Sequence, residues 1–199
     1  MRSGLAVILV GAAVWMWPTA LTAADDLRTA VTVRVYQTAG LSSPLEKRAL
    51  AEAETLLLAA LVDVTWRGCT DPHPPTACDV PPGPSELLLR IVREGASRRD
   101  GSATLGDALI DRHAGGGALA TVYFHHVARL AKGSGTDVEV LLGRAAAHEL
   151  GHLLMRASTH PRGGLMRPCW TPGEVRRNRA ADWAFAAGDA AAMRRPGPR

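Results

Sequence analysis

One short segment constrains this chain more than any other: residues 145–155 have the sequence AAAHELGHLLM. Thr136 and Glu139 precede it with the three-residue spacing of a capping box, which predicts a helix that continues to the end of this segment. Two histidines four residues apart on a helix lie about 40° apart around its axis, so both rings can reach one ion. Burying imidazoles on an apolar helix without partners is unfavourable. We therefore predict that His148 and His152 bind a metal ion.

The residue types at these positions suit zinc. Imidazole nitrogens are common zinc ligands, and a catalytic zinc site has three protein ligands and an open position for water. Glu149 directly follows the first histidine in HELGH. Its carboxylate can take a proton from a zinc-bound water and pass that proton to a leaving amine. We predict Zn²⁺ as the cofactor and Glu149 as the general base of a hydrolysis reaction.

Two residues are candidates for the third ligand. His160 lies eight residues after His152, and Pro161 favours an extended conformation at His160 over a continued helix. The chain can therefore turn back and bring His160 to the metal, although a surface loop position for it also remains open. Glu174 is the alternative ligand, but it already has a structural explanation as the closing residue of a capping box with Thr171. We predict His160.

HELGH, the downstream histidine and a Gly-Leu-Met turn together resemble the metzincin clan of zinc-dependent metallopeptidases. In that clan a methionine turn lies beneath the metal, and the resemblance gives this role to Met166. The match extends from His148 to Met166 and departs from the clan's HExxHxxGxxH pattern. Met155 stands where the clan has glycine, and Ser158 stands where it has the third histidine. The resemblance implies a small metzincin-like zinc metallopeptidase of an exported bacterial group, with a longer turn before His160.

Hydrophobic patterns outside the motif predict a small sheet with helices. Residues 85–92 form a near-continuous apolar run, as expected of a central strand. Ser43, Pro44 and Glu46 predict a capped helix start. The order of elements predicts an α+β fold, in which a mixed β-sheet packs against a long helix and the HExxH helix, with a C-terminal helix. Strands are predicted at 29–37, 62–67, 85–92, 108–110 and 117–124, and helices at 43–61, 125–130, 136–155 and from 171 past 183.

The first residues have the order of a secretory signal peptide. Arg2 precedes an apolar run at 5–17 that is shorter than the roughly 20 residues of a membrane span, and small residues follow it. An uncleaved N-terminal anchor is the alternative. We predict a signal peptide at 1–24, one zinc-peptidase-like domain at 25–193 and a disordered tail at 194–199. The protein would then be exported to the periplasm or the extracellular space.

The three cysteines are compatible with export, because disulfides form in oxidising compartments. Cys69 and Cys78 enclose a proline-rich loop that cannot form regular structure, so we predict a disulfide between them. Cys169 is then left as a free thiol, and we expect it to be buried. His73, His113, His125 and His126 are expected to be ordinary exposed histidines, although the last two could line a cleft.

Charge and composition exclude one class of partner. The formal net charge is +4, and the arginines are scattered with no basic stripe among aromatic residues, so we do not expect nucleic-acid binding. We expect a monomer that acts on a peptide or protein substrate, with no stable membrane association after signal cleavage. Residues 117–124 are expected to form a sheet edge to which an extended peptide adds. The alternative is a non-catalytic zinc-binding exported domain, which would have no need of the Glu149 carboxylate.

Overall fold

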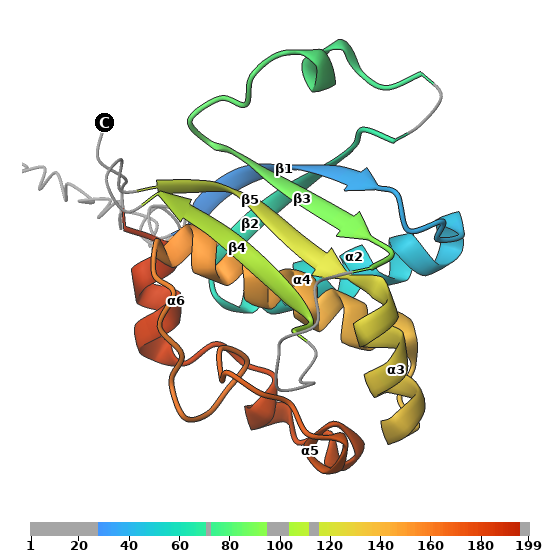
Figure 1. The fold of residues 1–199 in the computed structure, drawn as a ribbon. Helices are drawn as coiled ribbons and strands as arrows, with labels where there is room; N and C mark the ends of the chain where they lie inside the picture. The colour runs from blue at the N-terminus through green and yellow to red at the C-terminus, as the bar shows by residue number, and fades with distance from the viewer. Residues whose placement is uncertain (1–27, 71–72, 95–103, 112–115, 196–199) are drawn as a thin grey trace, which may run out of the picture.

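The computed structural model describes residues 28–70, 73–94, 104–111 and 116–195. In this part of the chain, five strands form one sheet and the helices gather mainly on one of its faces (Figure 1). The strands are β1 (Thr29–Gln37), β2 (Val62–Gly68), β3 (Glu86–Val92), β4 (Gly106–Asp111) and β5 (Gly116–Tyr123). The helices are α2 (Ser43–Ala59), α3 (Phe124–Ser134), α4 (Val138–Met155), α5 (Pro172–Arg177) and α6 (Ala187–Met193), with short 3₁₀ turns η1 (Thr76–Asp79) and η2 (Ala180–Asp182).

The sheet is mixed, with the strand order β2-β1-β3-β5-β4. The first four strands in this order pair in parallel, and β4 pairs antiparallel with β5. The predicted α+β fold and the central position of β3 are therefore confirmed. The prediction that residues 117–124 form a sheet edge is wrong, because β5 lies between β3 and β4. Among the described residues, β4 is the edge strand on this side of the sheet and β2 is the edge strand on the other. Strand β4 is short, and its place in the sheet does not follow from its sequence.

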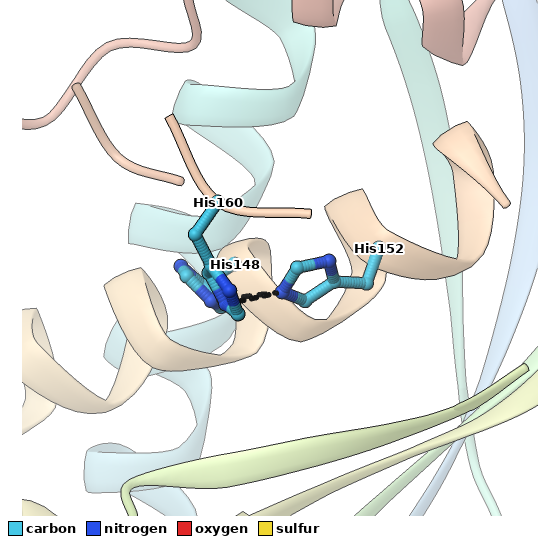
Figure 2. A group of neighbouring side chains, drawn as sticks. All are labelled: His148, His152 and His160. Atoms are coloured by element: carbon cyan, nitrogen blue, oxygen red, sulfur yellow. Dashed lines mark hydrogen bonds between the residues drawn. The ribbon is translucent and has the colours of Figure 1, made fainter. Parts of the chain in front are cut away.

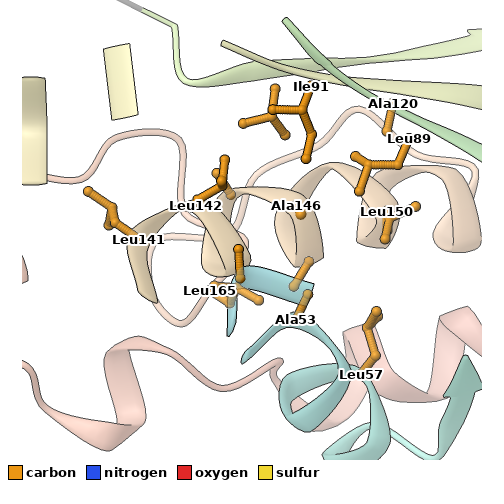
Figure 3. Close-up of a cluster of buried hydrophobic side chains, with 14 of the residues drawn as sticks. Ala53, Leu57, Leu89, Ile91, Ala120, Leu141, Leu142, Ala146, Leu150 and Leu165 are labelled. Carbon is orange, nitrogen blue, oxygen red and sulfur yellow. The ribbon is translucent and has the colours of Figure 1, made fainter. Parts of the chain in front are cut away.

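The core lies between the sheet and the two long helices α2 and α4 (Figure 3). Alternation within β1 sends Val33 and Val35 into this core and Arg34 to the opposite face. Helix α4 is buried along most of its length, which explains its many alanines. At Gly143, an added Cβ would lie only 2.4 Å from the Ala49 carbonyl of α2. Small residues thus allow α4 to fit closely between α2 and the sheet.

Two of the three predicted capping boxes are wrong. Helix α2 has Ser42 rather than the predicted Ser43 as its N-cap, and the Ser42 side chain makes no cap hydrogen bond. Helix α4 has Asp137 as its N-cap, also without a side-chain bond. The carboxylate of Glu139 instead accepts a 2.8 Å bond from Arg48, which joins the start of α4 to α2. The predicted Thr171–Glu174 box is confirmed.

The predicted C-terminal helix is also divided into shorter pieces. Helix α5 ends at Arg177, and its C-cap Asn178 adopts a left-handed conformation with φ of 44°. The Asn178 side chain accepts a 2.8 Å bond from Arg144 of α4, so a tertiary contact holds this break. Residues 180–182 then form η2, and Trp183 is buried before α6 begins.

The face of the sheet opposite α2 and α4 carries the segment between β2 and β3, which contains the short turn η1 (Figure 1). The predicted Cys69–Cys78 disulfide closes this segment, with its two Cα atoms 5.8 Å apart. Arg34 donates a 2.7 Å bond to the Val80 carbonyl and pairs with Glu86. These contacts attach the segment to the sheet.

The predicted signal peptide at 1–24 and residues 196–199 of the predicted tail lie outside the described residues. Among the helices of the described ranges, none combines the length and the hydropathy needed to cross a membrane.

Candidate metal centre

Three histidines meet at one point beside α4 (Figure 2). His148 and His152 project from the same face of the helix, and His160 reaches them from the segment that follows it. The Nε2 atom of His152 lies 3.1 Å from Nε2 of His148 and 3.0 Å from Nε2 of His160. One nitrogen from each ring can be chosen so that all three lie within 4.8 Å of one another. These residues could hold a metal ion.

The other ring nitrogens of the two helical histidines are engaged by backbone carbonyls. Nδ1 of His148 lies 2.9 Å from the Leu165 oxygen, and Nδ1 of His152 lies 2.7 Å from the Ala157 oxygen. A carbonyl can only accept, so each Nδ1 carries the proton and each Nε2 presents a lone pair to the common point. Metal-binding histidines are typically oriented in this way. Two ligand nitrogens in a tetrahedral zinc site lie about 3.3 Å apart, close to the observed spacings, so the donor set fits.

Burial keeps the imidazole rings of His148 and His152 in the neutral form that binds metals. His148 and His152 are 8% and 4% exposed, whereas His160 is exposed. Burial lowers the pKa of His148 to about 3, and nearby positive charge, including that of Arg167, acts in the same direction. Burial also lowers the pKa of His152. Both rings are therefore neutral at physiological pH, as metal coordination requires.

A tight turn beneath the helix brings Leu165 and Met166 against it. Gly164 has φ of +71°, a conformation that glycine adopts at little cost. Met166 is fully buried, and a Cβ added at Gly151 would lie 2.9 Å from its sulfur and 2.8 Å from a ring carbon of Phe185. The glycine of HELGH is thus explained by the close approach of Met166 and Phe185 to the helix.

Glu149 points toward the sheet edge and is 6% exposed. Burial raises the pKa of its carboxyl group to about 8, and the negative charge of Asp107 adds to the shift. Its side chain lies against Gly106, the first residue of β4. A Cβ at Gly106 would lie 2.8 Å from Glu149 Oε1 and 2.5 Å from the Thr121 carbonyl. We did not predict this role for Gly106, although a glycine at the start of a strand is a known signal of close approach.

A cleft of about 630 Å³ opens beside the histidines and Glu149. One wall is β4 with the residues just before it, a second is α3, and a third is the segment at 167–170. Cys169 belongs to this third wall and is exposed, so the prediction of a buried thiol is wrong. Arg167 and Trp170 take the more buried positions of the segment instead.

His126 differs from its expected exposure, whereas Glu174 makes the predicted capping contacts. His126 is buried rather than exposed, because its Nδ1 contacts the Thr104 carbonyl at 2.7 Å, and its ring lines the cleft. The Glu174 carboxylate accepts bonds of 2.8 and 2.7 Å from the backbone and hydroxyl of Thr171. Glu174 is not a member of the histidine cluster. His113 lies outside the described residues, while His73 is exposed and His125 pairs with Glu94.

Fold and site together define an α+β protein with a three-histidine cluster that could hold a metal ion, beside a buried glutamate. No protein-family model matches the chain, and neither does any curated protein sequence. Among solved structures it is similar to archaemetzincin from Methanopyrus kandleri, with 18% identity and a TM-score of 0.47. That comparison covers 89% of this chain and 97% of the other. A likeness at this level establishes no common family, so the cluster has to be interpreted from its own geometry.

Proposed function

We propose that this protein is a zinc-dependent metallopeptidase that hydrolyses peptide bonds. His148, His152 and His160 hold the zinc ion, and Glu149 is the general base. The observation that carries the proposal is the convergence of three Nε2 atoms next to a buried carboxylate, at the side of an open cleft. Zinc, when bound, supplies a Lewis acid that lowers the pKa of water and polarises a carbonyl group.

The chain's own part in the reaction is proton transfer and orientation. With a pKa of about 8 the Glu149 carboxyl group is mostly protonated at neutral pH, and the positive charge of a zinc ion held by the three histidines would favour its carboxylate form. In that form Glu149 takes a proton from water as the water oxygen bonds to the scissile carbonyl carbon. It then delivers that proton to the amide nitrogen as the C–N bond breaks. Its burial against Gly106 restricts the carboxylate to one side of α4 and excludes bulk solvent from it. In this account Leu165 and Ala157 orient two of the ligand rings and have no chemical role.

The substrate is a peptide or protein in an extended conformation. Within the part of the chain that the structure describes, strand β4 has a neighbouring strand on one side only, and it forms a wall of the cleft beside Glu149. An extended peptide can add to such an edge through main-chain hydrogen bonds. Ala108 and Ile110 of this strand line the cleft, whereas Leu109 between them is 64% exposed and lies outside the cleft lining. The site of peptide addition is therefore β4 rather than β5.

We propose further that the protein is exported and acts as a monomer. The Cys69–Cys78 disulfide is compatible with an oxidising compartment. The amino-terminal sequence has the order of a signal peptide, after whose removal no stable membrane association is expected. The scattered arginines do not favour nucleic acid as a partner.

Elemental analysis of the purified protein, combined with cleavage of a broad peptide library, tests the function. We expect about one zinc per chain and hydrolysis that stops when a chelator removes the metal. Bound zinc without cleavage of any peptide would favour the alternative of a non-catalytic zinc-binding domain. A protein that binds no zinc would exclude both.

A further inference from the structure

A buried arginine holds the turn that lies beneath the histidines. Arg167 is only 5% exposed. Its Nη1 donates to the Gly164 carbonyl at 2.8 Å and to the Asp182 carbonyl at 2.5 Å. One guanidinium nitrogen therefore joins the beginning of the turn to the segment before α6. Bonds from a charged donor to buried carbonyls are among the stronger hydrogen bonds of a protein.

The same turn carries the carbonyl that orients a predicted metal ligand. The Leu165 oxygen accepts from Nδ1 of His148 at 2.9 Å. The Leu165 nitrogen donates to the Ala184 carbonyl at 2.9 Å, so this residue is also attached to the segment before α6. The position of the acceptor for His148 is thus set by two links to that segment, one through its own backbone and one through Arg167.

Stacking on Trp183 fixes the arginine in turn. The guanidinium carbons of Arg167 and Arg144 lie 4.7 and 4.1 Å from the centre of the Trp183 ring. Arg144 belongs to α4 and lies four residues before His148. Nη2 of Arg167 is buried without a hydrogen-bond partner, and Nε of the same side chain lies 3.8 Å from a Glu174 oxygen. Contact of the guanidinium group with the aromatic ring helps to offset the free-energy cost of burying these nitrogens.

Aromatic rings in edge-to-face contact link the stack of Trp183 with Arg144 and Arg167 to the histidine cluster. Trp170 lies perpendicular to Trp183, with ring centres 5.2 Å apart. It is also nearly perpendicular to His148, with ring centres 5.7 Å apart. His148 therefore has two connections to the stack, through the Leu165 carbonyl and through the Trp170 ring. His152 has neither, because its Nδ1 contacts Ala157 just beyond the end of α4.

We infer that Arg167 is a positioning residue for the metal site, which it serves by fixing the Leu165 carbonyl and hence the ring of His148. This inference rests on the proposed function, because it assumes that His148 binds the metal. Residues that orient ligands in this indirect way typically contribute 10- to 100-fold to metal affinity. The effect should be specific to His148 and should leave the orientation of His152 unchanged.

Zinc affinity, measured by competition with a chromophoric chelator, tests the inference in the full chain. We expect Arg167→Met to bind zinc about 10- to 100-fold more weakly than the unaltered protein. Arg194→Met is the matched control, because Nη1 of Arg194 also donates to two carbonyls, those of Ala60 and Ala190, both at 2.8 Å. It should retain full affinity. Equal affinity in Arg167→Met and the unaltered protein, or an equal loss in Arg194→Met, would overturn the inference.

Exchange of the imidazole Nδ1 protons, measured by NMR on the zinc-bound protein, distinguishes a specific effect on His148 from a general destabilisation of the fold. In Arg167→Met the protected Nδ1 proton of His148 should exchange rapidly, while that of His152 remains protected. Loss of protection at both rings would refute the specific role. Arg167→Lys retains a charged donor and should lose affinity by a smaller factor, so it serves if the methionine variant does not fold. An unaltered protein that binds no zinc would instead refute the proposed function, and the two failures are therefore distinguishable.

Discussion

The two faces of the sheet each carry a cluster of polar side chains, and the clusters differ in how their hydrogen-bonding groups are satisfied. On the face opposite α2 and α4, Glu86 pairs with Arg34 and lies 2.6 Å from Nη1 of Arg67, so opposite charges meet directly. On the helical face, His148 and His152 direct two lone pairs toward each other over 3.1 Å. Acceptors at that distance repel unless a cation or a proton lies between them, and burial disfavours the protonated ring. The first cluster is complete as a structural element, whereas the second is arranged for a ligand.

The largest expected effect is the loss of peptide hydrolysis in Glu149→Gln, because this change removes the proposed base. It leaves the charged cluster around Glu86 unaltered. The amide is close in size to the carboxyl group but cannot accept a proton. We expect peptide hydrolysis to fall by about 10²- to 10⁴-fold while zinc content and melting temperature stay unchanged. Turnover and zinc content measured on the same preparation check this. Undiminished turnover would exclude Glu149 as the base.

Gly106→Ala tests how closely strand β4 packs against Glu149 on the helical face of the sheet. The added methyl group would lie 2.5 Å from the Thr121 carbonyl, so we expect a loss of about 1–3 kcal/mol in the free energy of unfolding. Gly133→Ala is the matched control, since a Cβ there meets no atom within 4 Å. It should be neutral or stabilise the protein by up to about 1 kcal/mol. Denaturant titration compares the two, and equal stabilities would contradict the close packing.

The charged cluster predicts a pH dependence of its own, in addition to the loss of stability between pH 6.5 and about 3 that the lowered pKa of His148 predicts. Arg34, with further help from the Gly83 backbone and Arg67, lowers the pKa of Glu86 from 4.5 to about 2. A carboxyl group with a depressed pKa stabilises the fold fully above its unfolded value and loses that contribution as the pH falls. We expect stability to decline between pH 4.5 and about 2, and Glu86→Gln to remove this component. An unchanged pH profile in that variant would contradict the assignment.

The smallest effect is expected for Glu174→Ala. This change removes the two bonds to Thr171 and thus one reciprocal helix cap. A lost cap costs about 1 kcal/mol, and the zinc content should remain unchanged. Thermal unfolding with parallel metal analysis provides the measurement. A loss of several kcal/mol would indicate a role for Glu174 beyond capping.

Local sequence patterns predict where most strands and helices lie. They do not predict which distant segments pack against them. The strand at β1 and the helix α4 follow from alternation and from helical spacing, which depend on adjacent residues. The position of β4 at the sheet edge and the exposure of Cys169 depend on contacts between distant segments, and no local pattern encodes them. The same holds for Glu139, whose spacing suits a capping box but whose carboxylate bonds to Arg48 of another helix.

Some features of the candidate site follow from local sequence, and others depend on contacts between distant segments. The pairing of His148 with His152 is a property of one helix and could be predicted from their spacing. The approach of His160 depends on the turn after α4, so its sequence left both a surface position and Glu174 as alternatives. Gly106 lies in a segment far from HELGH in the sequence, and Arg167 follows Met166 without belonging to any recognised pattern. Their importance becomes visible only once the chain is folded.

The central claim is that His160, and not Glu174, completes the metal site with the two helical histidines. Zinc retained after extensive dialysis, measured side by side in His160→Ala, His152→Ala and Glu174→Ala, tests it most directly. Removing one of three ligands should cost most of the zinc affinity, so both histidine variants should lose the metal and Glu174→Ala should keep about one zinc per chain. Zinc retained by His160→Ala and lost from Glu174→Ala would contradict the account.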